Sequence, residues 1–251
     1  MSDIQHSGRS LFIADLHLTD ERPQANGRFF HFLDHTARGA DALYILGDLF
    51  EYWVGDDDTQ SAVAQECAQH LKTLANAGTP VYFMHGNRDF LLAKRYANAS
   101  GMQLLTDPTP VDLYGTPSLL MHGDTLCTDD LRYQHLRTWL RKPWVQNMLR
   151  ALPLGLRHRL AGNARAGSER SKANKPYAIM DVNQAAVIQA MQDTGAMRLI
   201  HGHTHRPAHH LLKISGQTCE RWVLPDWYGN GGYLSCTAEA CQLLNLDGTR
   251  L

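Results

Sequence analysis

The sequence is short of cysteine and of long apolar runs, and both shortages narrow the class of protein. Its five cysteines are odd in number, scattered among 251 residues, and never form a Cys-x-x-Cys pair. We therefore expect neither a disulfide framework nor a thiolate zinc site, as in a reducing cytoplasm. No run approaches the roughly 18 apolar residues of a membrane-spanning helix, and residues 1–10 lack the apolar core of a signal peptide. We expect a soluble protein, or one that lies at most on a membrane surface.

Net charge is nearly absent as well, since 24 Lys and Arg stand against 25 Asp and Glu. Such a balance argues against a general nucleic-acid binder unless the charge is concentrated locally. Residues 131–175 are such a concentration, with eleven Lys or Arg and one acid, Glu169. The same stretch carries an apolar side chain at every fourth position, which predicts a helical stripe: Leu136, Leu140, Trp144, Met148 and Leu152. We interpret 131–175 as a basic and apolar helical insertion within a single domain, 1–251.

Short apolar runs alternate with segments of helical spacing along the chain. Runs rich in branched or aromatic side chains favour buried strands, and their alternation with helices favours a layered α/β fold. The expected strands are 11–14, 42–46, 81–84, 119–121 and 198–200, with additional antiparallel strands at 221–224, 232–236 and 241–246. The expected helices are 27–37, 59–77, 89–98 and 182–193.

Residues of the kind that bind metal ions follow each of the first five expected strands. They occur in the segments Asp15-Leu16-His17, Gly47-Asp48, Gly86-Asn87-Arg88-Asp89, His122-Gly123-Asp124 and Gly202-His203-Thr204-His205. Because the carboxyl ends of strands in an α/β sheet share one edge, where ligands bind, these five segments would converge in one crevice. Each motif alone is a weak signal, but all five in order predict a common site.

The residue types suit two divalent cations about 3.5–4 Å apart, which can clamp the attacking and leaving oxygens of a phosphoryl displacement. Mutual repulsion of the cations requires anionic ligands, and Asp48 is our candidate for a carboxylate shared between them. The other expected ligands are Asp15, His17 and His205 for one ion and Asn87, His122 and His203 for the second. Mixed oxygen and imidazole ligands suit manganese, iron or zinc better than calcium. Asp89 and Asp124 are expected to hold backbone or imidazole groups instead of a metal.

These motifs resemble the calcineurin-like metallophosphoesterase superfamily over about residues 11–207. Longer strings resemble, nearly end to end, the family of UDP-2,3-diacylglucosamine diphosphatases of Gram-negative lipid A biosynthesis. They are FIADLHL (12–18), GDLFEYWVGDD (47–57), HGNRDFLL (85–92), MHGDTLC (121–127), IMDVN (179–183) and HGHTHRP (201–207). The resemblance implies an α/β (α+β) four-layer β-sandwich flanked by helices, so we expect two facing sheets in place of one open sheet.

The resemblance also implies a reaction: hydrolysis of the pyrophosphate of UDP-2,3-diacylglucosamine to UMP and 2,3-diacylglucosamine 1-phosphate (lipid X). It implies the same seven ligands, two ions that are most often Mn2+, and attack by an activated hydroxide on the alpha phosphorus, with Asp48, Arg88 and His203 as catalytic residues. The substrate contacts that it implies are Asn87, Arg88, Asp130, Ser168, Lys172, Lys175 and His203. Lys172 is a departure, because the family pattern has a small polar residue there.

Two features of the residues agree with this substrate. Arg88 cannot donate a proton near neutral pH but can clamp phosphate oxygens, which suits an anhydride whose sugar phosphate leaves without protonation. The apolar and basic insertion would accept acyl chains and face anionic lipids, or its stripe could simply pack onto the core. We expect a cytoplasmic monomer, attached peripherally to the inner membrane.

Other functions stay open at this point. A phosphoesterase of the same superfamily acting on a cyclic nucleotide, a nucleotide or a phosphoprotein would keep the metal site and change the substrate. A non-enzymatic scaffold would be expected to have lost ligands, and all seven are present. Nucleic-acid binding would use the basic insertion, but no nucleic-acid motif accompanies it.

Overall fold

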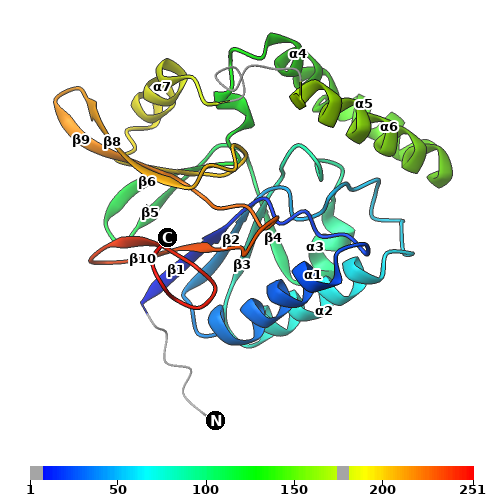
Figure 1. Cartoon of the computed structure of the whole chain (residues 1–251), viewed down its shortest axis with the longest axis horizontal. Helices are drawn as coiled ribbons and strands as arrows, with labels where there is room; N and C mark the ends of the chain where they lie inside the picture. Colours follow the sequence, from blue (N-terminus) through cyan, green and yellow to red (C-terminus); the bar gives the residue numbers. More distant parts are fainter. Residues whose placement is uncertain (1–7, 174–180) are drawn as a thin grey trace.

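The computed structural model describes residues 8–173 and 181–251, with side chains described to residue 167 in the first range. Two β-sheets face each other between two layers of helices (Figure 1). The two facing sheets confirm the expected sandwich. The sheets also contain three strands that the sequence did not predict: β4 (Met102–Leu105), β5 (Thr109–Leu113) and β8 (Ala208–Ile214).

The first sheet has six strands in the order β11-β10-β1-β2-β3-β4. The bounds of the other five strands are β1 (Arg9–Ile13), β2 (Ala42–Leu46), β3 (Val81–Met84), β10 (Tyr233–Thr237) and β11 (Cys241–Leu244). The strands β1 to β4 run parallel, so the loops that follow β1, β2 and β3 leave the sheet at the same edge.

The second sheet has five strands in the order β5-β6-β7-β9-β8, including β6 (Thr116–Met121), β7 (Arg198–His201) and β9 (Gln217–Val223). The central strands β6, β7 and β9 are parallel, and the edge strands β5 and β8 are antiparallel to their neighbours. The strand expected at 221–224 is β9, which pairs antiparallel with β8, as expected, but parallel with β7. The unpredicted strand β8 reverses the chain once more, so that β9 enters parallel to β7.

Alternation of side chains along β1 explains the layers. Phe12 packs between the sheets with Leu46, Leu120 and Ile200, whereas its neighbour Leu11 faces the helices. The outer face of the first sheet is covered by α1 (Pro23–His31), its π-helical continuation Phe32–Thr36, α2 (Ala62–Asn76) and α3 (Lys94–Ser100). The outer face of the second sheet is covered by α7 (Gln184–Thr194). This succession of helix, sheet, sheet and helix is the four-layer arrangement.

The expected helices 59–77 and 182–193 are confirmed as α2 and α7. Asn183 caps α7 by accepting hydrogen bonds from the amides of Ala185 and Ala186, and Gly195 ends it in the left-handed conformation. The expected helix 27–37 begins earlier, at Pro23. The expected helix 89–98 is wrong at its start, because α3 begins only at Lys94 and the preceding residues form a loop.

The insertion forms three helices: α4 (Leu131–Leu140), α5 (Pro143–Ala151) and α6 (Leu154–Ala173). The expected apolar stripe therefore does not continue along one helix. Pro143 interrupts it between Leu140 and Trp144, because proline lacks the amide hydrogen that an inner turn of a helix requires. The three helices lie together outside the sheets (Figure 1). Within the described ranges, no helix is both long enough and apolar enough to cross a bilayer.

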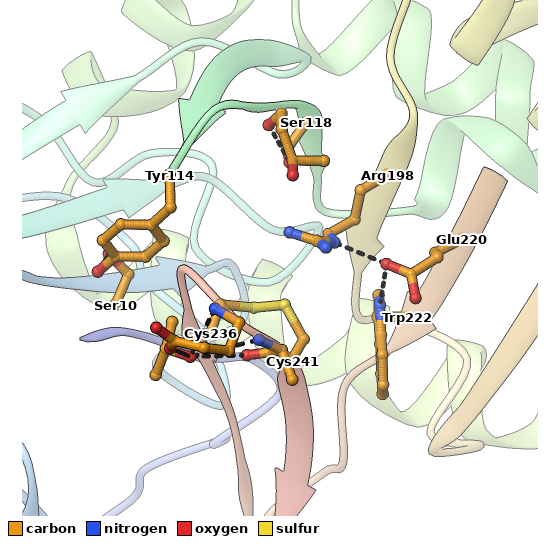
Figure 2. Close-up of a disulfide and its surroundings, with 12 residues drawn as sticks. Ser10, Tyr114, Ser118, Arg198, Glu220, Trp222, Cys236 and Cys241 are labelled. Atoms are coloured by element: carbon orange, nitrogen blue, oxygen red, sulfur yellow. Dashed lines mark hydrogen bonds and ion pairs between the residues drawn. A yellow bond between two sulfur atoms is a disulfide. The ribbon is translucent and has the colours of Figure 1, made fainter. Parts of the chain in front are cut away.

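One cysteine pair forms a disulfide that the sequence did not predict, since no disulfide framework was expected. Cys236 and Cys241 lie opposite each other in the antiparallel register of β10 and β11 and are joined by a disulfide bond (Figure 2). Their spacing along the chain did not predict the bond, because the hairpin register that brings the two sulfur atoms together is a property of the folded sheet. Cys236 pairs with Ser10 of β1, at the opposite end of that strand from Asp15.

Candidate metal centre

The seven expected ligands lie together where β1, β2 and β3 of the first sheet and β6 and β7 of the second end. Two groups of side chains each place their ligand atoms within 4.8 Å of one another. The first group is Asp15, His17 and His205, and the second is Asp15, Asp48 and His122. Asn87 and His203 adjoin the second group through His122.

Asp15 belongs to both groups and is fully buried. Its Oδ2 accepts a hydrogen bond of 2.7 Å from the amide of His203, and its Oδ1 lies 3.5 Å from Nε2 of His205. That Oδ1 atom is buried and accepts no hydrogen bond within the part of the chain that the structure describes. A bound cation would stabilise a carboxylate oxygen that is buried and accepts no hydrogen bond.

Asp48 lies between an imidazole from each side of the site. Its Oδ2 is 3.9 Å from Nε2 of His17, and its Oδ1 is 3.9 Å from Nε2 of His122. The amide of Arg88 donates a hydrogen bond of 2.8 Å to Oδ1 and fixes the carboxylate. Asp48 can therefore present one oxygen to each of two cations.

The ring of His122 is oriented by the backbone. Its Nδ1 lies 2.9 Å from the carbonyl oxygen of Leu46, to which it can donate, and this leaves Nε2 facing the site. The amide oxygen of Asn87 is 3.1 Å from that Nε2, and the ring of His203 is centred 5.0 Å from the ring of His122. These three side chains therefore form the second half of the candidate centre.

Backbone strain is concentrated on the expected ligands. Seven non-glycine residues of the described chain have a positive φ angle, and five of them are Asp15, His17, Asp48, His203 and His205. Left-handed backbone is unfavourable for such residues and persists only where the surrounding structure imposes it, most often at functional sites. The fold therefore holds these five side chains in place at an energetic cost.

Two glycines leave room for the carboxylates. A Cβ atom on Gly86 would lie 2.1 Å from Oδ1 of Asp48, and one on Gly202 would lie 2.5 Å from Oδ2 of Asp15. Any larger residue at either position would displace a carboxylate from the site. The sequence motifs contain glycine at these points because the backbone approaches the acids closely.

The electrostatics of the cluster favour added positive charge. Burial raises the pKa of Asp48 to about 7. Burial opposes protonation of His122, but the carboxylates, Asp48 above all, raise its pKa to about 9. Burial lowers the pKa of His203 to about 3, so that this ring is neutral and able to coordinate. A donor set of buried carboxylates and imidazoles with these properties fits divalent cations.

The two acids that were expected to act beside the ligands have different roles. Asp89 accepts hydrogen bonds from the amides of Leu49 and Gly86, as expected. Among the described residues, the carboxylate of Asp124 accepts from neither a backbone amide nor an imidazole, contrary to expectation. It accepts instead from Nε of Arg137 and from the hydroxyl of Tyr133, both on α4 and both at 2.6 Å.

A cavity of about 290 Å³ opens beside the centre, between the insertion and the core. Asn87 and Arg88 line it where it meets the candidate metal centre, here called the metal edge, and Arg165 of α6 also lines the cavity. Its apolar wall is formed by Trp53, Val54, Phe90, Leu91, Leu136, Leu140, Leu149, Leu160, Ala161 and Ala164. Two of the expected substrate contacts, Asn87 and Arg88, therefore face both the cluster and the apolar space.

The remaining expected substrate contacts fall on the insertion. Asp130 is the N-cap of α4 and accepts a hydrogen bond from the amide of Tyr133. Ser168 and Lys172 lie on α6, where side chains are outside the described set, and Lys175 lies outside the described residues. The sequence reasoning missed Glu51, which is buried beside His17. Its signal was a single acid within the apolar run at residues 49–54.

The arrangement matches a known family. Residues 8–207 match the family model described as calcineurin-like phosphoesterase, and the chain belongs to this family. Among solved structures, a conserved uncharacterised protein from Streptococcus pneumoniae TIGR4 matches with a TM-score of 0.48 and 12% identity, covering 97% of this chain and 92% of that chain.

Curated relatives define the group more narrowly. The chain is 49% identical over 235 residues to the UDP-2,3-diacylglucosamine hydrolase of Enterobacter sp. (strain 638), covering 94% of this chain and 98% of the relative. It is 50% identical over 236 residues to the protein of the same name from Escherichia coli O81 (strain ED1a), with the same coverage. Within the calcineurin-like phosphoesterases, the chain belongs with the UDP-2,3-diacylglucosamine hydrolases.

Proposed function

We propose that the chain hydrolyses the pyrophosphate bond of UDP-2,3-diacylglucosamine, giving UMP and 2,3-diacylglucosamine 1-phosphate for lipid A synthesis. The observation that carries the proposal is that Asn87 and Arg88 belong at once to the Asp/His cluster and to the wall of the apolar cavity. A diphosphate at the cluster would thus have its acylated sugar beside an apolar space. The two relatives that are 49% and 50% identical to the chain are named as hydrolases of the same compound.

The proposed ligands are the seven identified from the sequence. Asp15, His17 and His205 would hold one ion, Asn87, His122 and His203 the other, and Asp48 both. The positions of the two Asp48 oxygens, each facing a histidine of a different half, support a shared carboxylate. Two divalent ions, which we propose to be Mn2+, would supply the Lewis acidity that makes water nucleophilic at neutral pH and neutralises phosphoryl charge.

Residues of the chain perform the remaining tasks. Arg88 lines the cavity beside the cluster, where its guanidinium can clamp oxygens of the diphosphate through paired hydrogen bonds. The neutral ring of His203 lies at the same edge and can support the uridine-side phosphoryl group. Arginine retains its charge at neutral pH, so Arg88 stabilises the leaving sugar phosphate electrostatically and not by protonating it.

The insertion, 131–175, is proposed to receive the acyl chains. Leu136 and Leu140 of α4 and Leu160 of α6 face the cavity from one side, and Trp53 and Phe90 face it from the core. Burial of acyl methylenes against such a wall contributes roughly 0.8 kcal/mol for each CH2 group. Asp130, Ser168, Lys172 and Lys175 stay proposed contacts to the sugar and phosphate groups.

The outer surface of the insertion supports contact with a membrane. Trp144 is 57% exposed, Leu131 is 66% exposed, and Met148 is 46% exposed, in a segment with a large excess of basic residues. Exposed apolar side chains beside basic ones favour the interface of an anionic bilayer. We propose peripheral attachment to the cytoplasmic face of the inner membrane. All seven proposed ligands come from one chain, and we propose that the protein acts as a monomer.

The direct test is release of UMP from UDP-2,3-diacylglucosamine by the purified protein, with Mn2+ and with a chelator. Turnover that requires the metal supports both the chemistry and the substrate. Hydrolysis of a generic phosphodiester without any UMP release would support the proposed metal centre and contradict the proposed substrate.

A further inference from the structure

Glu51 is a buried carboxylate, 2% exposed, that adjoins the metal edge three residues after Asp48. Side chains from four separate segments surround it. They are His17 after β1, Arg88 after β3, Arg165 on α6 and Tyr228 in the loop before β10. None of the roles described above for the seven proposed ligands accounts for this acid.

The two oxygens of Glu51 face different parts of the molecule. Oε1 lies 3.2 Å from Nε of Arg165 and 3.7 Å from a guanidinium nitrogen of Arg88. Both arginines line the cavity, so this oxygen faces the proposed substrate space. Oε2 accepts a hydrogen bond of 3.2 Å from the hydroxyl of Tyr228 and lies 3.7 Å from Nδ1 of His17.

Glu51 lies on the side of the His17 ring that faces away from the cluster. Nε2 of this ring faces Asp48 inside the cluster, and Nδ1 faces Glu51 on the opposite side. The ring of Tyr228 stacks on the ring of His17, with centroids 4.8 Å apart. At 3.7 Å this contact is electrostatic and not a hydrogen bond, and the negative charge favours the ring orientation that directs Nδ1 toward Glu51.

The contact with Arg165 connects the insertion to the same acid. The side chain of Arg165 is 34% exposed, while that of Glu51 is 3% exposed, so the helix supplies the cation and the core supplies the fixed anion. A buried carboxylate is costly unless cations compensate it, and the two described arginines beside Glu51 can also face a diphosphate. Displacement of α6 would remove one of them from Glu51.

We propose that Glu51 is a positioning residue of the hydrolysis. It holds Arg88 and Arg165 at the mouth of the cavity through one oxygen, while its other oxygen keeps His17 and Tyr228 in place. Glu51 thereby joins α6 of the insertion to the metal centre. This inference rests on the function proposed above and adds a residue that sets the geometry of that site.

The test is a double-mutant cycle with Glu51→Gln and Arg165→Gln, measured by UMP release. Glutamine keeps the shape of Glu51 and its ability to accept from Tyr228, but removes the charge that both arginines require. We expect each variant to lower kcat/KM about 10- to 100-fold, the range found for residues that orient ligands. The double variant should be little worse than the poorer single one, because both changes break the same contact.

Two controls and a second readout separate positioning from general stability. Glu66→Gln on α2 and Arg159→Gln on α6 change exposed residues of the same kinds and should leave turnover unchanged. Amide hydrogen exchange of residues 154–167 should become faster in Glu51→Gln and Arg165→Gln and stay unchanged in both controls. Additive losses, or unaltered exchange of α6 in Glu51→Gln, would overturn the proposal. The exchange measurement uses no substrate, so its failure is distinct from failure of the wild type to release UMP.

Discussion

Arg137 of α4 and Asp124 form an ion pair of 2.6 Å at the strand end that carries His122. The carboxylate is fully buried, and the guanidinium also reaches Asp107 at 3.1 Å. Tyr133, one turn earlier on α4, donates to the same oxygen of Asp124. The first helix of the insertion, α4, is therefore held against the end of β6 by the contacts of Arg137 and Tyr133 with Asp124, as well as by the chain itself.

Replacing Arg137 with methionine should loosen this attachment. The change leaves Asp124 buried without its cation, and loss of one partner of a buried pair costs roughly 3–5 kcal/mol. The free energy of unfolding of Arg137→Met, measured in urea, should decrease by an amount near the lower end of this range, because the side chain of Arg137 is 17% exposed. Arg132→Met, at an exposed position on the same helix, is the control and should unfold like the wild type. Equal stability of the two variants would contradict the structural role of the pair.

Asp48→Asn should abolish turnover while the fold is retained. The amide keeps the size of the side chain but removes the negative charge proposed to be shared by two cations. We expect a loss well beyond the roughly 100-fold upper range for residues that only orient ligands. Metal analysis after gel filtration should show less than the wild-type content, with an unchanged circular dichroism spectrum. Asp193→Asn, on the exposed side of α7, serves as the matched control. Full activity of Asp48→Asn would refute the two-metal assignment.

Narrowing the cavity should discriminate between substrates by chain length. Ala161 lines the cavity on α6, and a tryptophan there would fill space proposed for acyl methylenes. Overpacking of this kind costs about 1–3 kcal/mol, so kcat/KM for the long-chain substrate should fall roughly 5- to 150-fold. A diacetyl analogue should be hydrolysed by Ala161→Trp as by the wild type. Ala151→Trp, on an exposed position of α5, should affect neither substrate. Equal losses for both substrates would place the acyl chains elsewhere.

The exposed face of α5 should contribute to membrane binding. Trp144→Ser combined with Met148→Ser removes two apolar side chains that are 57% and 46% exposed. Cosedimentation with anionic phosphatidylglycerol vesicles should weaken, because each side chain loses up to about 1.5–3 kcal/mol of burial in the interface. Leu211→Ser, which changes an exposed leucine of β8, should bind vesicles like the wild type. Unchanged binding of the double variant would remove α5 from the proposed membrane surface.

The disulfide should matter little for catalysis. Cys236 and Cys241 are five positions apart, so their bond closes a short loop, and the chain-entropy relation gives about 2 kcal/mol at most. The double variant Cys236→Ser with Cys241→Ser should lose no more than this amount in urea unfolding and should retain its turnover. Wild-type protein under reducing conditions should behave in the same way. A large loss of activity would mean that the β10–β11 hairpin influences the metal edge.

Much of the fold was predictable because local patterns and global structure agree. The strands 42–46 and 81–84 were correct at both ends, since buried apolar runs there are bounded by residues that end a strand. Strand β8 was missed because its sequence mixes His209, His210 and Lys213 with apolar residues, and His209 and Lys213 lie on its exposed face. The prediction of a continuous stripe across the insertion was wrong because it followed the four-residue period and neglected Pro143, at which a new helix begins.

The residues that meet in the centre could be predicted from the motifs alone. Each of the five motifs follows a strand, and the parallel arrangement of strands brings such positions to one edge. The surroundings of that centre could not be predicted, because they depend on how the sheets and helices pack. The pairs Asp124–Arg137 and Glu51–Arg165, the disulfide and the cavity all bring together segments whose contact is not predicted by any periodicity or motif in the sequence. Such contacts depend on the direction and depth at which side chains are buried, and these are fixed only when the sheets and helices pack together.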